Sequence, residues 1–407
     1  MGVREVHGAG GDVRMRRDGR PMDVHDVRRG MDIHHNLVAG RRIETVRPDG
    51  RRLVFERGRP GYIGHAYVVR GHAFERRAYY FHGRAYNRFY SPYQYHGFAM
   101  RVYVPGRYYP AAYYGWAYRP WPVGVRYGWG WRSDPWFGYY GAYFTPYPVY
   151  ASPSLWLTDY MLADTLSDAY QAGLADGAAG APYAGPALPP ETKQMIADEV
   201  QNDIALENQE AGNNMAQAAP DPASSGIARL LNDGRTHVLV AGGEVDVTDA
   251  NGQECALTDG DVVQVAGPVA PEATTVQASV LASKGGKDCA RGVVVALGLD
   301  DAQEMNNHLR EKVDQGMEVL AQQQGKDGLP AAPASALAAP MDSMAAQGAP
   351  PPDPAGAQEL EQQDAQAQQS ETDVLGAGAA GAAPAPTQVP APVVRQAPKN
   401  SSDDLFK

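Results

Sequence analysis

Polar and apolar residues alternate through residues 41–104, a pattern typical of β-strands that bury one face. The turn signal Pro48-Asp49-Gly50 separates two short strands that we expect at Ile43–Val46 and Arg52–Glu56. Farther along, an Arg-Gly or His-Gly dipeptide interrupts the aromatic runs at Gly71, Gly83 and Gly97. Because this spacing suits successive strand–turn units, the pattern predicts a β-meander.

The period changes to that of an α-helix in three other segments. The first covers residues 154–176, the second starts near Glu191 after a Gly/Ala/Pro linker, and the third covers about 301–323. Asp301-x-x-Glu304 has the form of a capping box at the start of the third helix. The apolar face of that helix favours docking on the barrel expected at residues 225–299, and pairing with a second copy of the chain is the alternative.

Residues 225–299 form the clearest globular unit in the sequence. Asn251-Gly252 is a strong hairpin signal, and Asp259-Gly260-Asp261 leads into a run rich in valine. Six short strands are expected, at His237–Ala241, Val245–Thr248, Glu254–Leu257, Val262–Ala266, Val276–Ala282 and Val293–Leu297. So many short strands in so small a unit predict a closed, SH3-like β-barrel.

These patterns divide the chain into five parts and predict a mainly β fold with a few helices, of the α+β class. The expected parts are an irregular segment at 1–40, an Arg/Tyr-rich β-meander with an aromatic Gly/Pro segment at 41–153, two helices at 154–213, a small barrel with its helix at 225–324, and a long disordered tail at 325–407. The tail is expected to be disordered because Ala, Pro, Gln and Gly bury too little apolar surface to offset chain entropy.

The most unusual stretch is residues 113–150, in which 16 of the 38 residues are aromatic. No charged residue occurs from Pro135 to Thr158, so a membrane span has to be considered. Prolines argue against a continuous helix, and the tyrosine hydroxyls would lack partners in hydrocarbon. Two interpretations remain, a layer that covers the Arg/Tyr sheet and an exposed adhesive surface. The neighbouring apolar helix favours the covering layer.

Charge is divided unevenly along the chain. Residues 1–150 hold 24 Arg, no Lys and 11 acidic residues, whereas residues 151–407 hold 12 basic and 36 acidic residues. A basic half joined to an acidic half indicates either an anionic partner or attraction between the two halves. The exclusive use of Arg favours stacking on aromatic rings, and the codon bias of a GC-rich genome would produce the same composition.

Arginine and tyrosine interleave closely in the β-meander, which makes this region the candidate binding surface. Arginine neutralises phosphate, and tyrosine offers a ring on which bases or sugars stack. An Arg–Tyr ladder that only stabilises a sheet has the same pattern, and we favour that structural explanation. The candidate polymer-binding residues are Arg76, Arg77, Arg84, Arg88, Tyr79 and Tyr86.

No catalytic or cofactor motif has a supporting context. The segment from Gly376 to Gly381 matches G-x-G-x-x-G but lies outside any strand–helix unit, so we expect no cofactor. The histidines lack the spacing of metal ligands, so no metal site is predicted. A glycan hydrolase needs two carboxylates in an aromatic cleft, and only Glu56, Glu75 and Asp134 could be nominated. We therefore expect a protein that is not an enzyme.

Cys255 and Cys289 are the only cysteines, and both fall in the expected barrel. Two cysteines alone do not make a zinc site, and one disulfide in an exported protein is the preferred interpretation. Two reduced, buried thiols are the alternative. A disulfide would close a loop of roughly 35 residues and stabilise the fold by about 3–4 kcal/mol.

Five sequence motifs together resemble a family of uncharacterised, exported bacterial proteins. The motifs are YYGWAYRPW, PWFGYYGAYFTPYPVYASPSLWLTDY, IADEV, GQECALTDGD and ASKGGKDC, and the likeness runs from about residue 23 to residue 325. The resemblance implies export and carries no activity and no residue role. Similar chains begin with a signal peptide, whereas this sequence opens with polar, Arg-rich residues. The expected location is periplasmic or extracellular if an upstream signal peptide has been lost, and cytoplasmic otherwise.

Taken together, these features predict a non-enzymatic envelope or secreted protein with a structural or interaction role. Its expected partners are a cell-envelope component, an anionic polymer or a second copy of the chain, with no transmembrane span. The alternative is a binding module for an anionic or sugar polymer through the Arg/Tyr surface, and a cell-wall glycan hydrolase is a remote third hypothesis.

Overall fold

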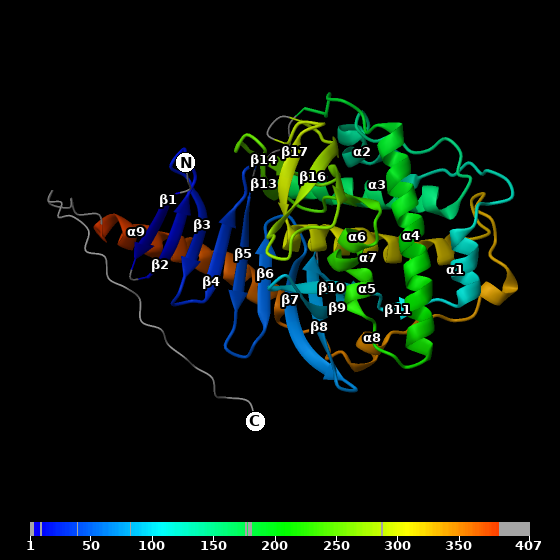
Figure 1. Cartoon of the computed structure of the whole chain (residues 1–407), viewed down its shortest axis with the longest axis horizontal. Coiled ribbons are helices and arrows are strands. Elements are labelled where there is room, and N and C mark those ends of the chain that lie inside the picture. The colour runs from blue at the N-terminus through cyan, green and yellow to red at the C-terminus, as the bar shows by residue number, and fades with distance from the viewer. Residues whose placement is uncertain are drawn as a thin grey trace.

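Ten antiparallel strands form one sheet in which each strand pairs with the next along the chain (Figure 1). The computed structural model describes residues 4–381 except 9, 39, 82, 176, 178–180 and 286–287, and it describes no side chains for 377–381. The strands are β1 (Arg4–Gly8), β2 (Gly11–Met15), β3 (Pro21–Asp26), β4 (Met31–His35), β5 (Arg41–Val46), β6 (Arg52–Glu56), β7 (Gly61–Val69), β8 (His72–Phe81), β9 (Arg84–Tyr95) and β10 (Phe98–Val104). The strands of the predicted β-meander, β5 to β10, are all present.

The turns of the meander form where the sequence indicates them. Gly50 has a φ of 82°, and its N–H donates to the carbonyl of Arg47 at 2.9 Å. At the two dipeptides Arg70-Gly71 and His96-Gly97, both residues have positive φ. Type I′ hairpin turns require this conformation at both central positions, and glycine adopts it without a steric penalty.

The expectation of an irregular segment at residues 1–40 is wrong, because strands β1 to β4 occupy it. Each of these strands contributes only one or two apolar side chains, so their alternation is weak in the sequence. Val13, Val24, Met31 and Ile33 are buried on one face, where they pack against a helix from the far end of the chain. The local pattern alone therefore gives little sign of the strands.

A second, six-stranded sheet lies beside the helices, with the strand order β12-β15-β16-β17-β13-β14. Its strands are β12 (Thr236–Val240), β13 (Val245–Asp249), β14 (Glu254–Leu257), β15 (Val262–Ala266), β16 (Thr275–Ala282) and β17 (Val294–Gly298). All six expected strands are confirmed to within a residue at each end. Within the described ranges β14 does not pair with β12, so the closed, SH3-like barrel is not confirmed.

Three long helices pack against one another beside the six-stranded sheet, and shorter helices lie around them (Figure 1). The long helices are α3 (Pro153–Ala175), α4 (Pro190–Met215) and α7 (Leu299–Gln323), all near the expected positions. The short elements are α1 (Ala111–Tyr118), η1 (Gly130–Ser133), α2 (Pro135–Tyr140), α5 (Pro222–Ser225) and α6 (Ile227–Asn232). No helix in the described part of the chain is long and apolar enough to cross a membrane.

The predicted capping box at the start of α7 is wrong. Gly298 is the N-cap, so Asp301 lies inside the helix. Glu304 instead forms an ion pair with Arg77 of β8. The predicted docking of the apolar face is confirmed, because Leu309, Val313, Met317 and Leu320 are buried in the main core.

The aromatic segment 113–150 is part of the main core rather than a cover for the Arg/Tyr strands. Trp129 stacks on Trp156 of α3 at 4.9 Å between ring centroids, and its indole N–H donates to Tyr150 at 2.6 Å. Helix α7 lies on β10 and supplies the acidic partners of Tyr90 and Tyr103. The prediction that the aromatic segment covers the Arg/Tyr strands is therefore wrong, because helix α7 packs on these strands instead.

The expectation of disorder throughout residues 325–407 is wrong for the part up to residue 381, and residues 382–407 lie outside the described ranges. This part contains η2 (Ala334–Ala336), β18 (Met341–Asp342), α8 (Met344–Gly348) and α9 (Gly356–Gly381), and β18 pairs with β11 (Arg107–Tyr108). Helix α9 runs across the long sheet from β8 to β1 (Figure 1). Its buried residues follow a 3–4–3–4 spacing that places them on one face: Leu360, Gln363, Ala367, Ser370 and Val374.

Candidate functional site

Two neighbouring arginines of β8 point to opposite faces of the long sheet, and both are buried. Arg76 donates to the carbonyl of Pro350 at 2.6 Å on the α8 side. Arg77 donates to Glu304 of α7 at 2.9 Å, and its guanidinium carbon lies 4.0 Å from the ring centroid of Tyr90. Neither arginine is available to a polymer, because each already has partners inside the protein.

The other four candidate polymer-binding residues lie toward the β8–β9 hairpin. Tyr79 is half-buried, stacks on Tyr86 at 5.3 Å and shares a hydrogen bond with Tyr90. Arg88 lies over the ring of Tyr86 at 5.1 Å and 3.9 Å from a carboxylate oxygen of Glu311. Only Arg84 and Tyr86 are exposed. The six residues therefore do not form one exposed surface.

Arginines of the first strands and of the turns between them form ion pairs with the acidic C-terminal region. Arg29 bonds to Asp373 at 2.8 Å, and Arg41 bonds to Asp364 at 2.8 Å. Arg51 contacts both Asp353 and Glu359. The uneven charge of the two halves thus reflects attraction within the chain, which was one of the two interpretations of the sequence.

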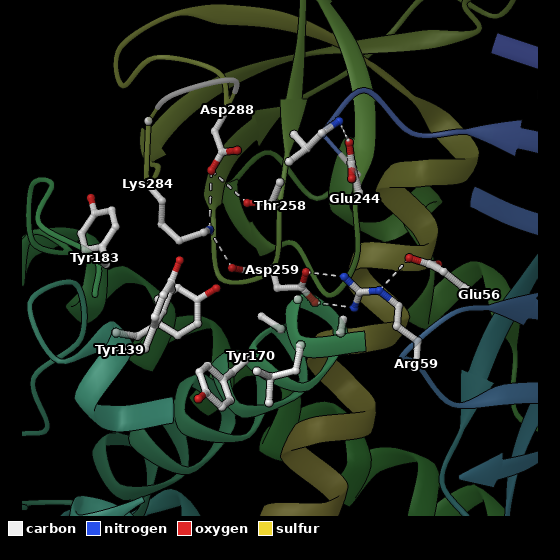
Figure 2. Close-up of a pocket in the computed structure, with 17 residues that line it drawn as sticks. Glu56, Arg59, Tyr139, Tyr170, Tyr183, Glu244, Thr258, Asp259, Lys284 and Asp288 are labelled. Atoms are coloured by element: carbon white, nitrogen blue, oxygen red, sulfur yellow. Dashed lines mark hydrogen bonds and ion pairs between the residues drawn. The ribbon is translucent and has the colours of Figure 1, made fainter. Parts of the chain in front are cut away.

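A cavity of about 320 Å³ lies where several segments that are distant in sequence meet. We call it the tyrosine pocket. Its lining comes from α2 and the end of α3, from the β6–β7 turn, and from loops of the six-stranded sheet. Figure 2 shows Tyr139, Tyr170 and Tyr183 on one side and Thr258, Lys284 and Asp288 on the other.

Arg59 of the β6–β7 turn is fully engaged at the edge of the pocket (Figure 2). Its two terminal nitrogens donate to the two carboxylate oxygens of Asp259, both at 2.6 Å, and its Nε donates to Glu56 at 2.7 Å. Burial alone would raise the pKa of Asp259, but the guanidinium holds it below the ordinary value. Asp259 is therefore an ionised structural partner with no free oxygen.

Lys284 reaches down from the opposite loop and is equally engaged. Its ammonium donates to the Asp259 carbonyl at 2.8 Å and to Asp261 at 2.5 Å, and it lies 3.8 Å from Asp288. Asp288 accepts a hydrogen bond from Thr258 at 2.9 Å through Oδ2. Burial, and next the charge of Asp261, raise the pKa of Asp288 to about 6. Among the described residues, none donates to Asp288 Oδ1.

Tyrosines form the other wall of the pocket. Tyr139 lies 4.7 Å from Tyr140 and 5.8 Å from Tyr170, measured between ring centroids. The backbone N–H of Tyr183 donates to the carbonyl of Tyr139 at 2.9 Å and fixes the linker against α2. The hydroxyls of Tyr139, Tyr140 and Tyr170 make no hydrogen bond to another described residue, which leaves them available to a ligand.

The predicted disulfide between Cys255 and Cys289 is confirmed, with a Cα–Cα separation of 5.0 Å. Cys289 directly follows Asp288, which lines the pocket. The N–H of Cys289 also donates to the carbonyl of Ala256 at 2.8 Å. The disulfide therefore anchors the loop that carries Asp288.

The three carboxylates nominated for hydrolysis are not brought together. Glu56 lines the pocket, Glu75 is buried between Arg77 and Arg101, and Asp134 is exposed at the start of α2. Burial would raise the pKa of Glu75, but the two guanidinium groups hold it below its ordinary value. Among the described residues, no group of three or more His, Cys, Asp or Glu side chains is arranged to hold a metal ion.

The sequence did not identify the pocket as a site. Asp259 and Asp261 were interpreted only as the lead into a strand, and the tyrosines only as part of an aromatic layer. One available signal was the pairing of the two cysteines, since it implies that the segment after Leu257 approaches the loop before Cys289. Comparison of the chain with protein-family models, curated proteins and solved structures gave no match.

Proposed function

We propose that the protein is a non-enzymatic binding protein of the cell envelope or of the secreted fraction, and that it holds its ligand in the tyrosine pocket. The observation that carries this proposal is the cavity of about 320 Å³, which combines three unpaired tyrosine hydroxyls with the unpaired oxygen of Asp288. Ligand sites typically combine such apolar rings with a few polar groups.

A hydrolytic role is less favoured because of how the carboxylates are engaged. Both oxygens of Asp259 accept hydrogen bonds from Arg59, so this carboxylate is not available as a nucleophile or base. Glu56 and Glu244 also accept hydrogen bonds, from Arg59 and from the N–H of Val38, whereas a glycan hydrolase needs two carboxylates free to act together. Polymer binding through the Arg/Tyr strands is also less favoured, since Arg76 and Arg77 are buried with internal partners.

Location outside the cytoplasm is supported by the disulfide, because such bonds persist mainly in oxidising compartments. Fractionation of cells that express the natural gene tests this part. We expect the protein in the periplasmic or extracellular fraction, with thiols that react with maleimide only after reduction. Cytoplasmic protein with two reactive thiols would contradict it.

The pocket itself is tested by blocking it with one side chain. Gly173 lines the pocket on α3, and a Cβ atom there meets nothing within 4 Å. Gly173→Trp should fill part of the cavity without a clash at the backbone. Replacing a glycine within a helix by another residue also favours the helix. Gly212→Trp is the matched control, because Gly212 lies on α4 with the same open surroundings and does not line the pocket.

The measurement is the shift in melting temperature produced by a panel of sugars, amines, carboxylates, nucleotides and amino acids. We expect at least one class to stabilise the wild-type protein and the Gly212→Trp variant but not the Gly173→Trp variant. If no compound gives a shift that depends on Gly173, the pocket is not a ligand site and the proposal is wrong.

A further inference from the structure

We propose that the tyrosine pocket binds a compact organic cation, a ligand that carries a primary or quaternary ammonium group. This inference rests on the proposed function and specifies the class of ligand. It follows from which groups of the pocket are already engaged with each other and which remain free.

Both positive charges of the pocket are already paired with carboxylates of the protein. Arg59 directs its donors at Glu56 and Asp259, and Lys284 directs its ammonium at Asp259, Asp261 and Asp288. An anionic ligand would therefore meet no unpaired cation. It would instead meet an excess of negative charge, because the described lining contains four carboxylates and only two cationic side chains. This excess disfavours phosphates and carboxylates as ligands.

The free groups are acceptors and aromatic rings. Asp288 has one carboxylate oxygen to which no described residue donates. Burial raises the pKa values of the hydroxyls of Tyr140, Tyr143 and Tyr183, and the charge of nearby acids, Asp288 among them, raises these pKa values further. Asp288 therefore lies close to the tyrosine wall. An ammonium group is attracted by a carboxylate and by the face of an aromatic ring at the same time.

Ammonium groups of the protein already contact the rings of this aromatic segment. Lys284 lies 5.4 Å from the ring centroid of Tyr143, at the edge of the pocket. Lys193 lies 3.8 Å from the ring of Tyr147 and 5.0 Å from that of Phe144. These contacts give the distances expected for a cation held by aromatic rings, within about 6 Å. A ligand in the pocket would extend the same arrangement to Tyr139, Tyr140 and Tyr170.

Binding of a cation to this pocket should depend on pH through Asp288. The charged groups that face Asp288 are Asp259, Asp261 and Lys284, and the tyrosine hydroxyls near it are neutral in this range. Because Asp288 has a pKa of about 6, it is mostly protonated at pH 5 and mostly ionised at pH 7.5. Affinity for a cation should therefore be about tenfold weaker at pH 5.

The experiment measures binding to the full chain by ligand-observed NMR at pH 5 and 7.5 and constant ionic strength. The probes are tetramethylammonium, whose charge does not change with pH, glucosamine, glucose and glucuronate. We expect tetramethylammonium and glucosamine to bind at pH 7.5, and glucose and glucuronate to bind at least tenfold more weakly. Tighter binding of glucosamine than of tetramethylammonium would indicate that the natural ligand is an amino sugar. Tighter binding of tetramethylammonium would indicate a free organic amine.

Variants separate the contributions of charge and ring. Asp288→Asn should weaken tetramethylammonium binding about tenfold and remove its dependence on pH. Tyr170→Phe keeps the ring and should retain binding, whereas Tyr170→Leu should lose severalfold in affinity. Gly212→Trp should bind like the wild-type protein.

Three results would overturn the inference. Glucose that binds as tightly as glucosamine, with loss of binding in Tyr170→Phe, would show recognition of neutral hydroxyls. In the second result, tetramethylammonium fails to bind while another class of compound stabilises the wild-type protein but not the Gly173→Trp variant. That result would contradict the cation proposal and leave the proposed function intact. The absence of any pocket-dependent binding removes both.

Discussion

Arg77 Nη2 donates to Glu304 Oε1 at 2.9 Å and thereby joins the long sheet to helix α7. The same guanidinium lies over the rings of Tyr90 and Tyr62 and bonds to Glu75 at 3.2 Å. We predict that Arg77→Met lowers the free energy of unfolding by about 3 kcal/mol, because it leaves the buried Glu75 with only one cationic partner. Urea denaturation measures this change.

Arg84 provides the matched control for Arg77. It lies on the neighbouring strand β9 and is exposed, so Arg84→Met should change stability by less than about 0.5 kcal/mol. Similar losses in both variants would show that charge in the meander, rather than the contacts of Arg77, stabilises the sheet.

Gln363 connects helix α9 to two strands of the long sheet. Its side-chain amide donates to Thr45 at 3.0 Å and to the carbonyls of Leu53 at 3.1 Å and Ile43 at 3.3 Å, and it is fully buried. Gln363→Ala should cost about 2–3 kcal/mol, because it removes these donors and leaves a cavity. Hydrogen exchange should then accelerate in β1 to β6. Gln366→Ala, at an exposed position of the same helix, should have no effect on exchange.

Asp203 of α4 makes stability depend on pH. Burial, and next the charge of Glu199, raise the pKa of Asp203 to about 7, although Arg310 and Arg229 oppose the shift. The folded protein therefore holds a proton that the unfolded chain releases near pH 4, and stability falls as the pH rises toward 7. Asp203→Asn stays neutral, so we predict that above pH 7 it melts several degrees higher than the wild-type protein.

The control for Asp203 is Asp198→Asn, an exposed position on the same helix. Melting temperatures of both variants should be followed from pH 3 to pH 9. The Asp203→Asn variant should match the wild-type protein near pH 3, where Asp203 is protonated in the folded and the unfolded chain, and separate from it as the pH rises through 4 to 7, whereas Asp198→Asn should follow the wild-type curve throughout. Parallel curves for all three proteins would mean that Asp203 is ionised in the folded state.

The disulfide is expected to support both the fold and the pocket. Replacing Cys255 and Cys289 by serine should lower the free energy of unfolding by about 3–4 kcal/mol. It should also weaken binding of tetramethylammonium severalfold, because the loop that carries Lys284 and Asp288 loses its anchor. If stability falls while affinity is unchanged, the contacts of Lys284 alone position the loop.

The sequence was most informative where structure depends on neighbouring residues. The turn at Asn251-Gly252 forms as expected, with Gly252 at a φ of 76° and its N–H bonded to Asp249. The strands of the six-stranded sheet have valine-rich alternation and clear boundaries, so their positions were predictable. Closure of the sheet into a barrel depends on contacts between distant strands, and the sequence contains no local signal for it.

Helix α9 and strands β1 to β4 were missed for a shared reason. Each is too polar to be recognised alone, and each buries its few apolar residues against the other. The spacing from Leu360 to Val374 was a usable signal, but the Ala- and Gln-rich composition obscured it. Residues such as Gln363 and Ser370 also occupy positions of the stripe where apolar residues are expected.

The tyrosine pocket could not be predicted because its residues come from segments that are far apart in sequence. Arg59 and Asp259 are separated by 200 residues, and no local pattern links them. The tyrosines that form the wall have the same composition as the tyrosines buried in the core. Only the fold distinguishes Tyr139, which lines the cavity, from Tyr150, which is fully buried.

The packing of α9 on the long sheet determines when the first strands can reach their native packing during translation. Asp373 bonds to Arg29 across 344 residues, so the first strands emerge from the ribosome long before the helix that covers them. Until α9 has been made, the nascent chain presents these strands with an uncovered apolar face. Strands β1 to β4 therefore reach their native packing only after α9 folds onto them.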